Sequence, residues 1–145
     1  MKGLTLIVKK VSQLMCGLIF MYGIYIITHG HLTPGGGFAG GAIVAGSFIL
    51  LILAFGSEVV SLRKEETNTT VTESMSLLLV VILATAGLWL GSMLFFNNYL
   101  PKGEIGQLIS AGLIPLYNIL IGIEVAAALL TIFLALVIFK EEVAS

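Results

Sequence analysis

The chain has 145 residues, of which 58% are hydrophobic and 10% are charged, and its formal net charge is −1. Soluble domains carry roughly 25% charged residues, so this composition predicts that much of the apolar surface faces lipid or other subunits. The near-neutral charge argues against nucleic acid as a partner, because no basic patch is present to neutralise phosphates. The single cysteine, Cys16, excludes an intrachain disulfide and a cysteine-rich metal site.

Four apolar segments follow one another, each close to the roughly 20 residues that a membrane-spanning helix needs. The first two lie in a stretch from Val11 to Ser57 that contains no Asp, Glu, Lys or Arg, and a polar glycine-rich passage divides them. The polar residues from Glu58 to Glu73, before the third segment, predict either a solvated loop or a helix extension. We predict an all-α polytopic membrane protein that forms one domain over residues 1–145, with helices at about 6–28, 38–56, 75–96 and 117–139.

Basic residues near the ends of membrane spans predict the orientation. If both termini share one side, the other side holds only Lys102. The first side then holds six basic residues, namely Lys2, Lys9, Lys10, Arg63, Lys64 and Lys140. We therefore expect both termini in the cytoplasm, the glycine-rich passage outside, and a multi-pass location in the cell membrane.

The glycine-rich passage matches the dinucleotide pattern G-x-G-x-x-G at Gly35, Gly37 and Gly40. That fingerprint needs a preceding strand and a soluble βαβ unit, and both are absent from the predicted elements, so we reject nucleotide binding. We expect instead that Thr33 caps the second helix and that Pro34 takes its first position.

Two four-residue glycine pairs in this passage, Gly36–Gly40 and Gly37–Gly41, predict that a neighbouring helix approaches the backbone closely. The alternative is functional. In that case the partial positive charge of the helix N-terminus faces a subunit boundary or an ion path.

The stretch HGHLTPGGGFAGG, from His29 to Gly41, resembles the H-x-x-P-G-G-G-F-x-G-G signature of the B subunit of multisubunit sodium/proton antiporters, the MnhB or MrpB family. Four spans and the length of the chain also fit that family. The resemblance implies an accessory membrane subunit whose partners are the lipid bilayer and other membrane subunits of an antiporter module. The signature residues here are Pro34, Gly35, Gly36, Gly37, Phe38, Gly40 and Gly41.

The same subunit type occurs in archaeal respiratory complexes, including membrane-bound hydrogenases and their sulfur-reducing relatives. Antiporter B subunits are expected to carry a Phe-Asp-x-Gly-Val-like stretch near their end, where this chain has Asn118 in place of the acid and Glu124 six residues later. This difference favours the respiratory-complex variant, with hydrogenase-type redox subunits as further partners. A stand-alone multisubunit cation/proton antiporter is the first alternative, and a small four-helix transporter acting as a homo-oligomer is the second.

Glu124 is the only acid in the fourth predicted span, where an ionised group costs on the order of 3 kcal/mol to insert. It lies seven residues into that span, which predicts a depth of roughly 10 Å from the outer side. No Lys or Arg of the chain is expected at membrane depth to pair with it. We predict that Glu124 belongs to an ion or proton path, and the alternative is a structural acid that pairs with a neighbouring subunit.

His29 and His31 can accept protons near neutral pH, which makes them further pathway candidates, with structural or interfacial roles as the alternative. Two histidines alone in a loop form a poor metal site, so we expect no metal. Asn118 is the fourth pathway candidate, and hydrogen bonding across helices is its alternative role. No nucleophile–base pair or metal-ligand cluster is visible in the sequence, so we predict no catalytic residue, no cofactor and no enzyme activity for the chain alone.

Overall fold

The computed structural model describes residues 5–56, 62–90, 95–104, 106–107 and 110–144, and these residues contain four α-helices. The helices are α1 (Leu6–Thr28), α2 (Gly36–Phe55), α3 (Leu62–Leu90) and α4 (Ile114–Ala144). By length and composition, each contains a segment that could cross a membrane. This confirms the predicted all-α fold with four membrane-length helices.

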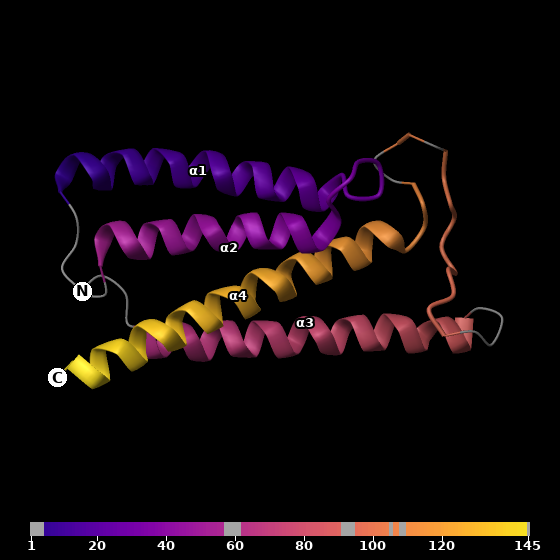
Figure 1. The fold of residues 1–145 in the computed structure, drawn as a ribbon. Coiled ribbons are helices and arrows are strands. Elements are labelled where there is room, and N and C mark those ends of the chain that lie inside the picture. The colour runs from indigo at the N-terminus through magenta and orange to yellow at the C-terminus, as the bar shows by residue number, and fades with distance from the viewer. Residues whose placement is uncertain (1–4, 57–61, 91–94, 105, 108–109, 145) are drawn as a thin grey trace.

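The helices lie side by side in the order α1, α2, α4, α3 (Figure 1). Helix α2 packs against both α1 and α4. Helix α3 packs against α4 and makes no comparable interface with α1 or α2 in the described residues. The start of α1 and the end of α4 lie together at one end of the molecule, termed here the terminal end, and the connections that follow α1 and α3 lie at the opposite, loop end.

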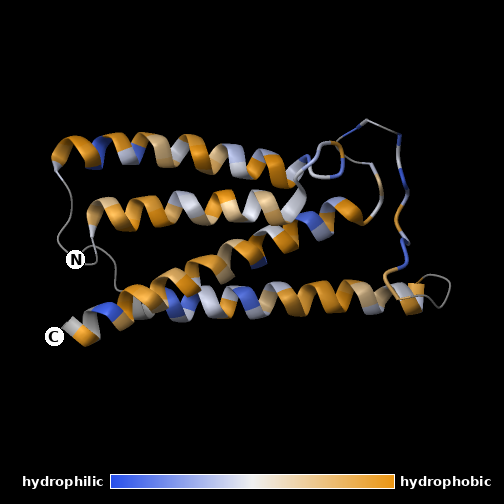
Figure 2. Cartoon of the chain, viewed as in Figure 1, coloured by the Kyte–Doolittle hydropathy of each residue, from blue (hydrophilic) through white to orange (hydrophobic). Residues whose placement is uncertain are grey.

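Hydrophobic residues predominate along most of the length of the helices, and hydrophilic residues gather in the first part of α3 (Figure 2). Large hydrophobic side chains such as Leu18 and Met21 of α1 are exposed, which suits a helix that faces lipid rather than water. The cluster of buried hydrophobic residues is small and joins Ile52 of α2 to Leu134 and Val137 of α4. The chain therefore has little interior of its own, and most of its apolar surface faces outward.

Helix α3 begins at Leu62, well before the predicted residue 75, and its described part extends to Leu90; residues 91–94 of the predicted span lie outside the described residues. In its polar start the hydroxyl groups bond to carbonyls of the same helix: Thr72 Oγ1 donates to the Asn68 carbonyl at 2.9 Å. The same bond to the carbonyl four residues earlier is made by Thr70, Ser74 and Ser76. Of the two alternatives for this segment, the helix extension is therefore correct from residue 62 onward.

The Asn98 side chain forms hydrogen bonds within the connection between α3 and α4. Its Oδ1 accepts hydrogen bonds from the backbone N–H groups of Leu100 and Leu113, both at 3.2 Å. Gly112, with a φ of 65°, passes so close to Asn98 that a Cβ added there would collide with the amide. These contacts fix the chain where it enters α4.

The four-helix topology and the distribution of basic residues together predict that Asn68 and Lys102 lie on opposite sides of the membrane. Both side chains are exposed. Single cysteines at these positions, in a Cys16→Ala background, should be treated with a membrane-impermeant maleimide in right-side-out vesicles. We expect Lys102→Cys to react at once and Asn68→Cys to react only after permeabilisation. Labelling of both from one side would contradict the topology, and the reverse pattern would contradict the orientation.

Candidate functional site

Helix α2 touches its two neighbours through the backbone, near its glycine-rich start. Gly40 faces α1, because a Cβ added there would lie 2.8 Å from the Gly23 carbonyl oxygen. Gly41 faces α4, because a Cβ there would lie 2.5 Å from the Gly122 carbonyl oxygen. Only a glycine hydrogen fits at such distances, so the three helices meet backbone to backbone. These four residues are termed the glycine contact below.

The carbonyl of His29 organises the turn between α1 and α2. It accepts hydrogen bonds from the N–H groups of Leu32 (2.8 Å) and Thr33 (2.9 Å) and from Thr33 Oγ1 (3.1 Å). The expectation that Thr33 caps α2 is therefore wrong, because its hydroxyl closes the end of α1 instead. Helix α2 starts after Gly35, which has a φ of 138° that places the chain in a glycine-favoured conformation, and Pro34 lies before the helix rather than at its first position.

The two histidines of this turn have different surroundings. The His29 ring stacks on Tyr25 with centroids 4.2 Å apart, and its Nδ1 lies 3.0 Å from the Tyr25 carbonyl and 3.1 Å from Thr28 Oγ1. The His31 Nε2 lies 3.4 Å from the carbonyl of Gln107, while its buried Nδ1 has no hydrogen-bond partner among the described residues. Neither ring belongs to a group of three possible metal ligands in the described part of the chain.

Asn118 lies beside the glycine turn, on the first part of α4. A Cβ at Gly37 would collide with its carbonyl oxygen, and one at Gly30 would lie 2.9 Å from its Nδ2. A Cβ at Gly36 would lie 3.6 Å from its Oδ1. The structure therefore brings Asn118 together with the glycines of the signature, whereas Phe38 is 68% exposed and takes its ring away from this contact.

Glu124 is half-buried on another face of α4. Six residues separate it from Asn118, and a helix of 3.6 residues per turn rotates by roughly 240° over that distance. Seven residues, or about two turns, separate it from Thr131, whose hydroxyl donates to Thr69 Oγ1 of α3 at 2.7 Å. Glu124 therefore belongs to the side of α4 that meets α3, and the structure does not join it to the turn residues.

Helix α4 begins at Ile114 rather than near residue 117. Glu124 lies ten residues into it, or about 15 Å from the start of the helix at about 1.5 Å per residue. Its carboxylate forms no hydrogen bond or ion pair with the described residues. An acid at this depth needs water or a partner from another subunit.

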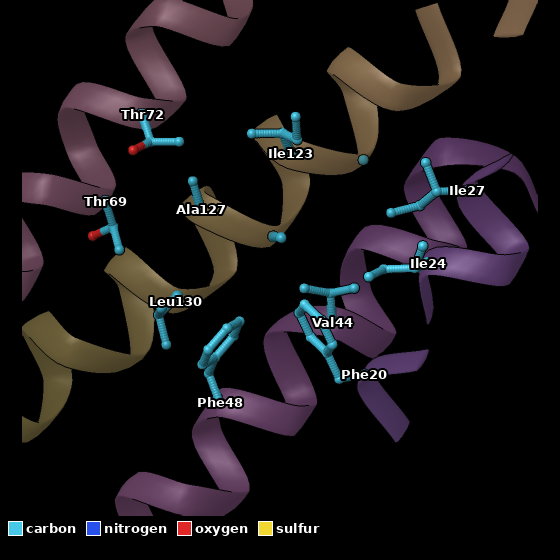
Figure 3. Close-up of a pocket in the computed structure, with 12 residues that line it drawn as sticks. Phe20, Ile24, Ile27, Val44, Phe48, Thr69, Thr72, Ile123, Ala127 and Leu130 are labelled. Atoms are coloured by element: carbon cyan, nitrogen blue, oxygen red, sulfur yellow. The ribbon is translucent and has the colours of Figure 1, made fainter. Parts of the chain in front are cut away.

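A cavity of 350 Å³ is lined by residues of all four helices (Figure 3). Its lining is almost entirely apolar and includes Ile24, Phe48 and Leu130, while Glu124 is not part of it. The Thr72 hydroxyl at its edge already donates to its own helix. The cavity is therefore a hollow for hydrocarbon or apolar side chains and lies apart from the acid.

Several residues that shape the site are absent from the sequence-based prediction. Gly23 and Gly122 complete the glycine contact. Ile27 of α1 packs against Gly122 of α4, since a Cβ at Gly122 would lie 2.7 Å from Ile27 Cδ1. The sequence signal for the first two is only that of a glycine inside an apolar span, and the first span also contains Gly17. The bond between Thr69 and Thr131 spans 62 residues of sequence and has no local signal.

A model of the domain related to the MnhB subunit of Na+/H+ antiporters matches residues 7–131. The chain belongs to the MnhB family. The match extends from the first turns of α1 to the middle of α4, so it includes the turn, the glycine contact and Glu124. It confirms the resemblance seen in the signature, and together with the four membrane-length helices it makes this chain a multi-pass membrane protein.

Three relatives illustrate the range of similarity to known proteins. An uncharacterized protein of Methanocaldococcus jannaschii is 36% identical over 134 residues, which cover 88% of this chain and 50% of that protein. A putative antiporter subunit of Staphylococcus aureus is 40% identical over 60 residues, covering 41% and 43% of the two chains. A solved chain of the membrane-bound sulfane sulfur reductase, an archaeal respiratory membrane complex, superposes with a TM-score of 0.76 at 34% identity, over 92% of this chain and 58% of that one. This chain thus spans about half the length of these relatives.

The glycine contact predicts that a single methyl group at Gly41 forces α2 and α4 apart. Gly46, on the same helix, is the matched control, because a Cβ there meets nothing within 4 Å. We expect Gly41→Ala to destabilise the folded protein by about 1–3 kcal/mol through overpacking and to lower the yield of assembled complex. Gly46→Ala should be neutral or stabilising, by up to about 1 kcal/mol, because alanine favours helix. Thermal unfolding in detergent measures both, and equal behaviour of the two variants would contradict the contact.

Proposed function

We propose that this MnhB-family chain is an accessory membrane subunit of a multisubunit sodium/proton antiporter module, within an archaeal respiratory complex of the membrane-bound hydrogenase or sulfur-reducing type. The similarity to a chain of the sulfane sulfur reductase complex carries this proposal, since it extends over 92% of the present chain. The similarity to the putative antiporter subunit extends over 41%. The antiporter-related family model also matches most of the chain, so the stand-alone antiporter is kept as the alternative.

In this proposal the chain forms one membrane domain over residues 1–145 and is not itself an enzyme. Redox chemistry and ion exchange belong to the assembled complex, and the present chain supplies a packed group of helices between other membrane subunits. Its outward-facing apolar surface and its small buried cluster support such a role, because a chain with so little interior of its own is suited to burial among neighbours.

Among the four pathway candidates, we propose Glu124 as the residue that serves the ion or proton path. It is half-buried within α4 and has no partner among the described residues, as expected for an acid that binds a mobile proton or cation. His29, His31 and Asn118 lie at the loop end on other contacts. We propose that these three hold the turn between α1 and α2 in place.

The composition of the purified complex separates the three possible assemblies. After extraction in mild detergent with a tag on this chain, we expect antiporter-module subunits together with iron–sulfur or nickel–iron subunits. Antiporter subunits alone would indicate the stand-alone antiporter. Recovery of this chain alone as a homo-oligomer, with transport activity after reconstitution, would contradict the accessory role.

The path hypothesis predicts that Glu124→Gln keeps the complex assembled and lowers sodium-dependent proton transport about a hundredfold, within the usual contribution of a positioned proton-transfer group. The amide keeps the shape of the side chain and removes only its titratable proton. Glu65→Gln, at an exposed acid near the start of α3, is the control and should transport normally.

The outcome of this experiment also tests the structural alternative. Loss of assembly in Glu124→Gln would show that the acid pairs with a buried cation of another subunit, because removing one partner leaves that charge uncompensated. Full assembly together with full transport would contradict both roles.

A further inference from the structure

The face of α3 that meets α4 changes character halfway along the helix. Its residues recur at spacings of three and four, the period of one helix face. In order from the terminal end they are Glu66, Thr69, Glu73, Ser76, Val80, Leu83, Ala84 and Gly87. The first four are polar and the last four are apolar. Burial supports this assignment, since Ser76 is 4% and Ala84 0% exposed on a helix that packs mainly against α4.

The hydrogen bond between Thr69 and Thr131 fixes the register of the two helices, which run in opposite directions (Figure 1). Ser76 lies two turns from Thr69 toward the loop end, and Glu124 lies two turns from Thr131 in the same direction. Ser76 and Glu124 are therefore at the same level of the α3–α4 interface. The polar half of the α3 face ends at the acid of α4.

The terminal half of the interface offers polar groups at each step toward Glu124. Glu66 and Glu73 are half-buried and lie seven residues, or about 10 Å, apart along α3. Between them lies the hydroxyl pair of Thr69 and Thr131, and Glu73 is one turn from the level of Glu124. Carboxylates and hydroxyls at such spacings can hold water between two helices, where apolar side chains would exclude it.

The loop half of the interface is apolar. Ala84 is fully buried, Leu113 is 2% exposed, and the Phe96 N–H donates to the Ala84 carbonyl at 3.3 Å. The Phe96 ring packs on Tyr117, two turns from Glu124 on the same face of α4, with centroids 5.4 Å apart. Thr85 is the one hydroxyl residue of α3 in this half, and its hydroxyl bonds to carbonyls of its own helix, as those of Thr69 and Ser76 also do.

We propose that Glu124 exchanges its proton with one side of the membrane only, the side that carries both termini, through water held in the terminal half of the α3–α4 interface. A proton passes from a hydronium ion in that water to the carboxylate, leaving water, and returns by the same steps. The loop half of the interface is the seal. This inference rests on the proposed pathway role of Glu124 and adds the direction of access.

Single cysteines in the assembled complex test the route, in a Cys16→Ala background. Ser76→Cys lies at the end of the polar half, and Val80→Cys, one turn further, is the matched position in the seal. Each is treated with a membrane-impermeant cationic methanethiosulfonate, in right-side-out and in inside-out vesicles. From the terminal side we expect Ser76→Cys to react about tenfold faster than Val80→Cys or more, because only the hydrated thiolate is reactive. From the loop side neither should react.

Equal reactivity at the two positions, or reaction of Ser76→Cys from the loop side, would overturn the inference. If Ser76→Cys does not assemble, Glu73→Cys takes its place, since that side chain is only half-buried. The result is independent of the transport assay. If the cysteines react from one side only but Glu124→Gln transports normally, the access route is kept and the pathway role of Glu124 is rejected. If Glu124→Gln loses transport but the cysteines do not react, the pathway role is kept and the access route is rejected.

Discussion

The absence of side chains at the glycine contact is the constraint on which the rest of the fold depends. In lipid, apolar surface gives helices little reason to associate, so close packing and hydrogen bonds between helices must do so. Gly40 and Gly41 are neighbours in sequence and point about 100° apart on α2. Gly40 therefore meets α1 and Gly41 meets α4. This one turn of α2 holds three of the four helices together.

This contact also decides which way Glu124 points. Gly122 is pressed against α2, and a residue two positions further along a helix lies roughly 200° around it. The acid is therefore turned away from α2 and toward α3, where Thr69, Glu73 and Ser76 lie. The signature glycines do not touch Glu124, but their packing against α4 turns the Glu124 side chain toward α3.

The sequence predicted the parts of the structure that have local signals. Long apolar runs gave four membrane-length helices, and the stretch from His29 to Gly41 gave the family, because a proline, three glycines and a phenylalanine in fixed order are unusual. The polar start of α3 was left open between loop and helix, since Thr and Ser lower helix propensity. Only the structure shows their hydroxyls bonded to carbonyls one turn earlier.

The candidate site was harder to predict, because its geometry depends on pairs that are far apart in sequence. Gly41 meets Gly122, and Thr69 bonds to Thr131, and no pattern in one sequence joins such partners. Thr33 illustrates the opposite difficulty: a hydroxyl residue before a helix usually caps that helix, but here the preceding turn folds back and the hydroxyl bonds to His29. Helix α4 starts at Ile114, three residues before the predicted start, and Pro115 lies in its first turn, where a proline is well tolerated.

Helix α3 stands at the edge of the row and is packed along one seam, against α4. The other three helices meet backbone to backbone at the glycine contact, whereas the bond between Thr69 and Thr131 joins α3 to α4 through side chains. Sliding one packed helix past another by a full turn is a displacement of about 5.4 Å. Such a shear would carry Ser76 past the level of Glu124 and bring Val80 to it, replacing a hydroxyl beside the acid by a hydrocarbon. In such a movement α3 would slide, and the three helices joined at the glycine contact would stay fixed.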